Sequence, residues 1–335
     1  MEAGPTTDSA VRARRVLALA GLIFLAGELA AGLALDRAPL RVRFHEAADA
    51  LARVRAAGPQ PDVLLFGSSR FKALILPDRV ESRLRETLGP GAPRVTTLAF
   101  NGGDLVGTDI MLEHVLAEGV RPRLALVELT PEWVRYPIPF LNGQLLRAFT
   151  WRDVYEWLPE LMQGTRRTLV CARIFPVYCY RNELLTWMMG EPPPYLAAPR
   201  SASQSKPSPK RDDPTHGANR WARRMKGYQT SPRALHLLER VIGRCREAGI
   251  ECVIVVPPIS SAHRALLAGH IENTFQQALA RLQRDDPTPL QDFSDRLPDD
   301  GFHDSTHGNR SGGERFSVIV ADEVIAPRWK ALKAE

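Results

Sequence analysis

The stretch VLLFGSSRF, residues 63–71, is an apolar run that stops abruptly at a glycine, two serines and an arginine. Continuous rather than alternating apolar character in residues 61–67 (PDVLLFG) is typical of a strand buried on both faces of a parallel sheet. Glycine and serine after such a run also mark a turn into a helix, where serine caps the first helical turn. The two serines therefore allow two interpretations, a helix cap and a reactive hydroxyl.

Three more runs of this kind follow, in residues 94–100 (RVTTLAF), 124–129 (LALVEL) and 250–258 (IECVIVVPP). Helical patterns lie before, between and after them, in residues 45–58, 77–89, 108–119, 231–249 and 312–325. This alternation predicts the α/β class, with a doubly wound, flavodoxin-like parallel sheet in three layers. The predicted α/β domain covers residues 44–132 and 232–328.

The alternation breaks between the third and fourth predicted strands. Residues 133–189 are rich in aromatic side chains and form a predicted, partly helical insertion, with residues 151–162 as its helix. Residues 190–231 are rich in proline, serine and basic side chains, which predicts a flexible linker.

Charge is concentrated in that same linker. The net charge is +6, and the segment from Arg200 to Lys226 holds eight basic and two acidic residues, so the remainder is about neutral. A nucleic-acid-binding face is therefore not expected.

The four cysteines lack zinc-site spacing; Cys252 lies in an apolar run, whereas Cys171 and Cys179 can pair in an oxidising compartment.

The N-terminus indicates the compartment. Three arginines precede residues 16–35, an apolar run with one acid, Glu28. The run is long enough to cross a bilayer and longer than the usual signal-peptide core. We expect a cytoplasmic segment 1–15, an uncleaved transmembrane anchor 16–35 and a body outside a bacterial inner or plasma membrane, in the periplasm. Cleavage after Ala34 is the alternative. Glu28 either faces a membrane partner or reaches the interface in its protonated form.

Polar residues follow the predicted strands at their carboxyl ends. The first strand ends in Gly67, Ser68, Ser69 and Arg70, the second in Asn101, Gly102, Gly103 and Asp104, and the third in Thr130, Pro131 and Glu132; Asp304 and His307 precede the last helix. Carboxyl ends of parallel strands meet at one edge, so these groups are expected to lie together.

A serine hydroxyl needs a base, and the base needs an orienting group. Ser69, His307 and Asp304 supply these three types, and glycines after the second strand let backbone amides approach an oxyanion. The alternative for the Asp304 loop is bracing by local hydrogen bonds. His303, Asp304 and His307 could together bind a metal ion, but all three lie on one short loop and a distant fourth ligand is lacking. No metal is therefore expected.

FGSSR after the first strand and DSTH before the last helix resemble the first and last signature blocks of the SGNH (GDSL-like) hydrolase superfamily. The N-terminal span, the G-S-S variant and the late D-x-x-H resemble its membrane-anchored branch, which includes the teichoic-acid D-alanyl-transfer protein and alginate O-acetylation proteins. The resemblance covers residues 60–130 and 232–326. It implies Ser69 as nucleophile, His307 as base and Asp304 as orienting group, with the Ser69 amide and Gly102 or Gly103 as oxyanion donors.

The sequence also departs from that pattern. Ser68 replaces the usual aspartate, and ELTPEW at the third block lacks the usual asparagine, so Asn101 or Thr130 would have to replace its side chain. Arg70 is a candidate to hold an anionic substrate group, or forms a surface salt bridge.

The expected function is a membrane-tethered serine acyl-esterase or O-acyltransferase without a cofactor. Its expected acyl acceptor is a surface polysaccharide or lipid, and a multi-span membrane acyltransferase is a candidate partner. The alternative is a non-catalytic binding or assembly module of an envelope polysaccharide system.

Overall fold

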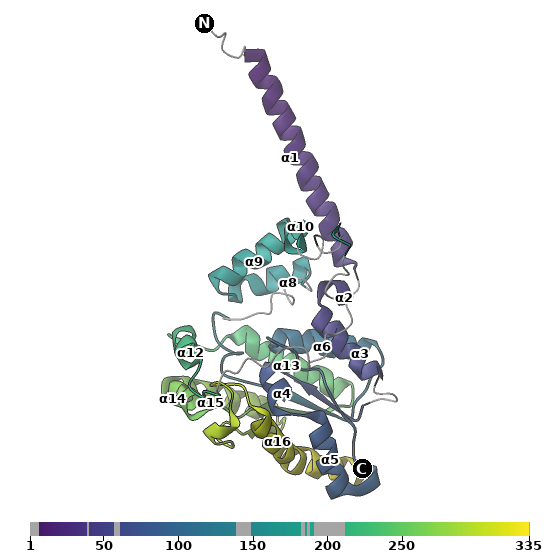
Figure 1. Ribbon diagram of the computed structural model, residues 1–335, viewed down its shortest axis with the longest axis vertical. Helices are drawn as coiled ribbons and strands as arrows, with labels where there is room; N and C mark the ends of the chain where they lie inside the picture. The colour runs from purple at the N-terminus through teal and green to yellow at the C-terminus, as the bar shows by residue number, and fades with distance from the viewer. Residues whose placement is uncertain are drawn as a thin grey trace.

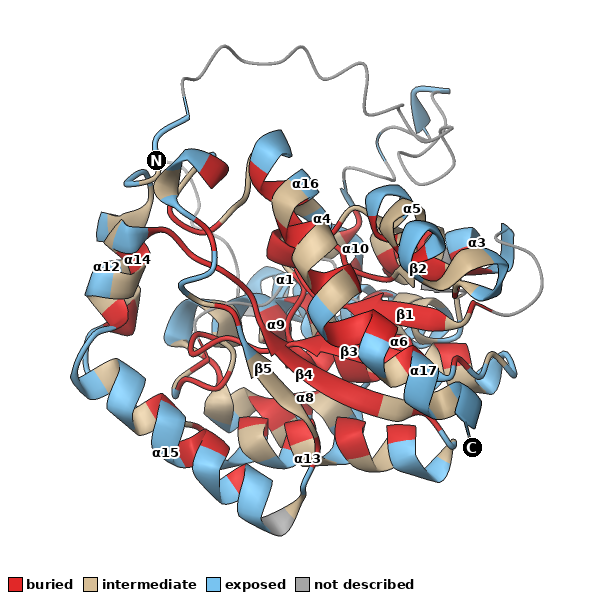
Figure 2. Cartoon of the chain, turned by 90° about the horizontal axis from the view of Figure 1, so that it is seen from below, coloured by how far each residue is buried: buried red, intermediate tan, exposed pale blue. Residues whose placement is uncertain are grey.

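A parallel sheet lies at the centre of the protein (Figures 1 and 2). The computed structural model describes residues 7–38, 40–56, 61–138, 149–181, 185, 188–190 and 212–334. Within these residues, five strands form one sheet in the order β2-β1-β3-β4-β5, and every neighbouring pair is parallel. They are β1 (Val63–Phe66), β2 (Val95–Thr97), β3 (Leu124–Glu128), β4 (Glu251–Val256) and β5 (Leu290–Asp292). The flavodoxin-like prediction is therefore confirmed.

Helices cover both faces of the sheet, which accounts for the continuous apolar runs. Leu64 and Phe66 point into one core and Val63 and Leu65 into the other, because successive strand residues face opposite sides. The first core is closed by α3 (His45–Ala56), α6 (Leu105–Ala117), α13 (Pro232–Glu247) and α15 (His270–Asp285). The second is closed by α4 (Ser69–Leu74), α5 (Pro77–Leu88), α16 (Arg310–Ile319), a π-helical turn (Val320–Ile325) and α17 (Ala326–Ala334).

The N-terminal helix α1 (Thr7–Asp36) projects away from this body (Figure 1). It is long and apolar enough to cross a membrane, a property that signal sequences share. A short helix α2 (Leu40–Arg43) leads from it to α3. The insertion forms α8 (Trp151–Trp157), α9 (Gln163–Ile174) and α10 (Pro176–Cys179), of which α9 and α10 contact α1. Cys171 and Cys179 are both free thiols.

The end of the predicted linker adopts a defined structure. Residues 212–231 contain helix α12 (Ala218–Met225), which packs against α14 (Ser261–Leu267). Met225 and Tyr228 form a small buried cluster with Ile259 and Leu267. The sequence predicted a flexible linker here, whereas these residues are fixed by non-local apolar contacts; residues 191–211 lie outside the described residues. Short 3₁₀ turns complete the elements: Gly89–Gly91, Leu158–Glu160 and Asp299–Gly301.

Candidate active site

Ser68 and Ser69 occupy different positions in the turn from β1 to α4. Ser68 is the N-cap of α4, and its hydroxyl oxygen accepts a hydrogen bond from the Arg70 amide at 3.1 Å. The same hydroxyl donates to the Glu128 carboxylate at 2.8 Å. Ser69 is the first residue of the helix, and its hydroxyl lines a cavity of about 250 Å³. The capping role therefore belongs to Ser68, which leaves the Ser69 hydroxyl for another partner.

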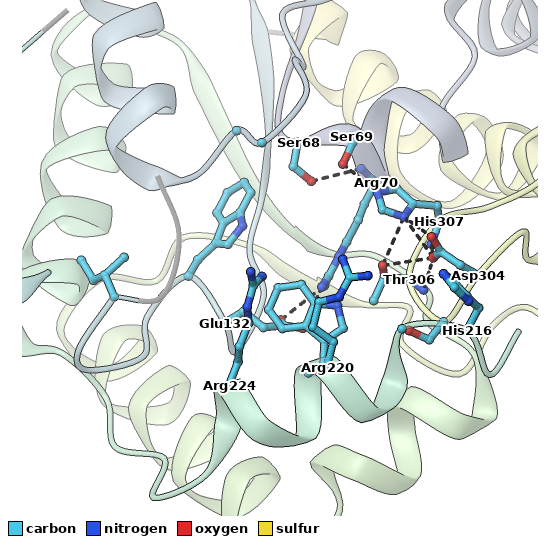
Figure 3. A pocket seen from close by; sticks show the side chains of 17 residues that line it. Ser68, Ser69, Arg70, Glu132, His216, Arg220, Arg224, Asp304, Thr306 and His307 are labelled. Atoms are coloured by element: carbon cyan, nitrogen blue, oxygen red, sulfur yellow. Dashed lines mark hydrogen bonds and ion pairs between the residues drawn. The ribbon is translucent and has the colours of Figure 1, made fainter. Parts of the chain in front are cut away.

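Ser69, His307 and Asp304 are joined by hydrogen bonds (Figure 3). The Ser69 Oγ lies 2.7 Å from His307 Nε2. On the other side of the ring, His307 Nδ1 lies 2.9 Å from Asp304 Oδ2 and 3.0 Å from Oδ1. Ser69 and His307 are 238 positions apart in the chain. They meet because β1 ends at the carboxyl edge of the sheet, where the loop before α16 also lies.

The protonation of this trio follows from its contacts. Burial raises the pKa of Asp304, but hydrogen bonds and attraction from His307, with the amides of Thr306 and His307, outweigh it and hold that pKa well below its usual range. Asp304 is therefore an anion and an acceptor, so His307 carries its proton on Nδ1 and donates it to Asp304. His307 Nε2 is then free of a proton and accepts the Ser69 hydroxyl hydrogen.

Backbone amides lie beside the Ser69 hydroxyl. The Ser69 amide is the first in α4 and has no partner within that helix. Gly102 and Gly103 also line the cavity. Gly102 has φ = +69°, which glycine adopts without steric cost. A Cβ on Gly103 would lie 2.4 Å from the Gly67 carbonyl oxygen, so only glycine lets the two loops approach this closely. The Gly103 amide donates to the Phe100 carbonyl, which leaves Gly102 as the better placed of the two glycines.

The two predicted substitutes for the oxyanion asparagine lie elsewhere. Neither Asn101 nor Thr130 is among the described residues that line the Ser69 cavity. Thr130 is buried and borders a neighbouring cavity that Arg70 also lines. The described residues that line the cavity thus include neither predicted substitute, and the Ser69 and Gly102 amides are the candidate oxyanion donors.

Arg70 belongs to a buried network. Its guanidinium donates to both carboxylate oxygens of Glu132, at 2.7 and 3.3 Å, and His263 Nε2 lies 2.8 Å from the same carboxylate. Burial acts to raise the pKa of Glu132, but Arg70 and His263 hold it well below its usual range. The predicted surface salt bridge is therefore a buried one, and Arg70 is engaged with Glu132 rather than open to a substrate anion.

Glu128 is a further buried acid that sequence reasoning missed. Its carboxylate accepts the Ser68 amide at 2.6 Å as well as the Ser68 hydroxyl. Burial raises the pKa of Glu128, opposed by Arg70 and by these hydrogen bonds. An acid at the end of an otherwise apolar strand was the available signal. Glu128 fixes the turn that presents Ser69.

Helix α12 forms a basic wall of the cavity opposite Ser69 (Figure 3). Arg220 and Arg224 line it, and neither pairs with a carboxylate among the described residues. The guanidinium groups of Arg70 and Arg224 lie 5.5 Å and 5.3 Å from the centroid of the Trp221 ring. His216, from the same predicted linker, also lines the cavity. The basic wall, Arg220 and Arg224, was not predicted as part of the site.

Comparison with known proteins gives similarity of fold only. No family model matches the sequence, and no curated protein matches it significantly. Among solved structures, the chain is similar to a GDSL-like lipase from Bacteroides thetaiotaomicron, at 9% identity over 86% of this chain and 99% of that one, with a TM-score of 0.41. It is also similar to a carbohydrate acetylesterase from Sinorhizobium meliloti, at 12% identity over 80% of this chain and 100% of that one, with a TM-score of 0.36. At this similarity, any assignment of function depends on the geometry of the site.

Proposed function

We propose that this protein is a serine acyl-esterase or O-acyltransferase with Ser69 as nucleophile, His307 as general base and Asp304 as orienting group. One observation carries the proposal: the Ser69 Oγ lies 2.7 Å from His307 Nε2, while the opposite ring nitrogen is held by an ionised carboxylate. A hydroxyl so placed loses its proton to the imidazole as it attacks an ester.

The reaction has two halves. Ser69 Oγ bonds to the ester carbonyl carbon while its proton passes to His307 Nε2, and the Ser69 and Gly102 amides stabilise the oxyanion. The carbon–oxygen bond to the alcohol then breaks, and His307 returns the proton to the departing oxygen. Water or an acceptor hydroxyl repeats these steps in reverse, which releases the acyl group as an acid or a new ester.

The proposed acceptor is a surface polysaccharide or lipid hydroxyl outside a bacterial inner or plasma membrane. In this proposal α1 is an uncleaved anchor, which keeps the site close to polymers made at the membrane. The basic wall supports an ester or acceptor that carries an anionic group, because Arg220 and Arg224 face the cavity without carboxylate partners in the described part of the chain. A multi-span membrane acyltransferase remains the proposed acyl donor.

Replacement of the nucleophile tests the proposal. Ser69→Ala should reduce hydrolysis of a small aryl acetate by at least about 1,000-fold, because it removes the hydroxyl that His307 activates. The matched control is Ser68→Ala, which removes the helix cap and should lower the free energy of unfolding by about 1 kcal/mol. Its loss of activity should be far smaller than that of Ser69→Ala, because the Ser68 amide still donates to Glu128 and holds the turn. Equal activity in the wild type and Ser69→Ala would show that this assignment is wrong.

A non-catalytic binding or assembly module is the second candidate. It is favoured by the lining of the cavity, where the described residues include no asparagine or glutamine to donate to an oxyanion. Removal of one such donor typically slows acyl transfer by about 100-fold to 1,000-fold. Labelling with a serine-reactive fluorophosphonate distinguishes the two functions: an adduct at Ser69 supports the enzyme, and a folded protein without an adduct supports the binding module.

A further inference from the structure

Helix α10 contacts α1 within its apolar run rather than beyond its end (Figure 1). The Val177 amide donates to the Glu28 carboxylate at 3.2 Å, and the ring centroids of Phe24 and Phe175 are 6.3 Å apart. Glu28 and Phe24 precede Asp36, the first charged residue after the run, by eight and twelve positions. At 1.5 Å per residue these contacts lie about 12 and 18 Å before the end of the run. If α1 spans a bilayer, α10 therefore lies at the depth of hydrocarbon.

The surface of this region is apolar and basic. The α9–α10 turn, defined as residues 163–181, contains four arginines and no acidic residue. Large apolar side chains are exposed on it and just after it: Ile174, Phe175, Val177, Tyr178, Leu185, Met188 and Met189. Met188 is 76% exposed and Tyr178 is 60% exposed. Many apolar side chains of α1 are exposed as well. An apolar surface continuous with a candidate span, and bordered by arginines, suits lipid tails and anionic headgroups.

Several backbone amides around α10 have the partners that a lipid environment requires. Polar backbone groups in hydrocarbon need partners within the protein. The Phe175, Cys179 and Tyr180 amides donate to carbonyl groups one helical turn earlier, and Pro176 has no amide hydrogen. The Val177 amide, at the start of α10, has no acceptor within its own helix. The Glu28 carboxylate accepts its hydrogen bond instead. Glu28 is only 7% exposed, so its partner is its own chain rather than a separate membrane protein.

We infer that the α9–α10 turn inserts into the bilayer as a re-entrant element in the leaflet from which α1 emerges. Its occupant is lipid, because the exposed apolar surface is continuous with α1 and reaches the same depth. Insertion gives the body a second attachment beside the span, which restricts its orientation over the membrane. This inference concerns residues outside the Ser69 cavity, so it stands or falls separately from the catalytic proposal.

Spin-label depth measurements test the insertion. The full chain, with Cys171→Ser and Cys179→Ser, carries one label at Tyr178→Cys and is placed in vesicles of phosphatidylethanolamine and phosphatidylglycerol. Collisions of the label with oxygen, relative to a water-soluble nickel chelate, should be several-fold more frequent than for a label at Glu113→Cys, a 64% exposed side chain on α6. Equal ratios at the two positions would overturn the inference and leave the apolar surface to a protein partner.

Substitution of Glu28 tests how the turn is held. Glu28→Gln keeps an acceptor oxygen for the Val177 amide, so the oxygen-to-nickel ratio at position 178 should not change. Glu28→Leu removes the acceptor, so the ratio should fall toward that of the α6 label. An unchanged ratio in both variants would refute the holding role of Glu28.

Discussion

Ser68 and Ser69 follow β1 as neighbours, yet their hydroxyl groups have different partners. The first turn of α4 places Ser68 over Glu128 and Ser69 beside His307. A Cβ on Gly67 would lie 2.6 Å from Glu128 Oε2, so the glycine before them gives the buried carboxylate its room. Glu128 then fixes the turn through the Ser68 amide and hydroxyl. The position of the Ser69 hydroxyl thus depends on Gly67, Ser68 and Glu128.

Asp104, the N-cap of α6, allows a prediction about pH at this same scale. Its Oδ1 accepts the Gly107 amide at 2.9 Å, whereas Oδ2 has no partner among the described residues. Burial raises the pKa of Asp104 to about 7, despite hydrogen bonds from the Gly107 and Val106 amides. In the unfolded chain the pKa is 3.8, so between these values the folded state holds a proton that the unfolded state has lost. Stability therefore falls as pH rises through this window, and the loss is complete above about pH 7.

Asp104→Asn should remove that dependence. Asparagine keeps the capping oxygen but carries no charge, so above about pH 7 the variant should be more stable by up to about 4 kcal/mol. Urea unfolding at several pH values measures the effect as a difference in slope between variant and wild type. Asp78→Asn, at an exposed position in the first turn of α5, is the control and should keep the wild-type slope. A steep slope retained in Asp104→Asn would contradict the prediction.

At the scale of elements, α12 determines what reaches Ser69. Its position is fixed by Met225 and by the segment that follows it, where the Tyr228 hydroxyl donates to the Pro131 carbonyl at 3.1 Å. The Tyr136 amide also donates to the Gln229 carbonyl at 2.7 Å. These contacts attach α12 to the segment after β3. The basic wall is therefore held at a fixed place rather than on a free chain.

The basic wall predicts selectivity for charge. Arg220→Gln with Arg224→Gln should raise the KM for a carboxylate-bearing aryl ester by about 10-fold to 100-fold, since a hydrogen bond to a charged group contributes about 1.5–3 kcal/mol. For a neutral aryl acetate, kcat/KM should change by less than about twofold. Arg223→Gln is the matched control, because Arg223 is exposed on the same helix and is not among the residues lining the cavity. Equal losses for both esters would argue against an anionic substrate.

At the scale of the whole molecule, the sequence predicts those strands and site residues whose signal lies in a short stretch of neighbouring residues. Three strands, β1, β3 and β4, were predicted because each is an apolar run that helices cover on both faces. The edge strand β2 was predicted because its run continues into the buried residues Leu98, Ala99 and Phe100. The other edge strand, β5, has three half-buried or exposed residues and leaves no such run. The meeting of Ser69, Asp304 and His307 could be predicted because parallel strands end at one edge. The place of α12 could not, because its composition resembles that of a solvated linker and its fixing contacts are distant in sequence.

The proposed anchor predicts a preference for substrates in the same membrane. Confinement of enzyme and substrate to one surface raises their effective concentration, as a linker does. The full chain should therefore cleave a fluorogenic lipid ester in its own vesicle at least about 10-fold faster than the same ester in separate vesicles. A water-soluble aryl ester should react equally in both preparations, which controls for the amount of active protein. Equal rates for the lipid ester would indicate that α1 and the α9–α10 turn do not position the site, and that the ester reaches it from solution.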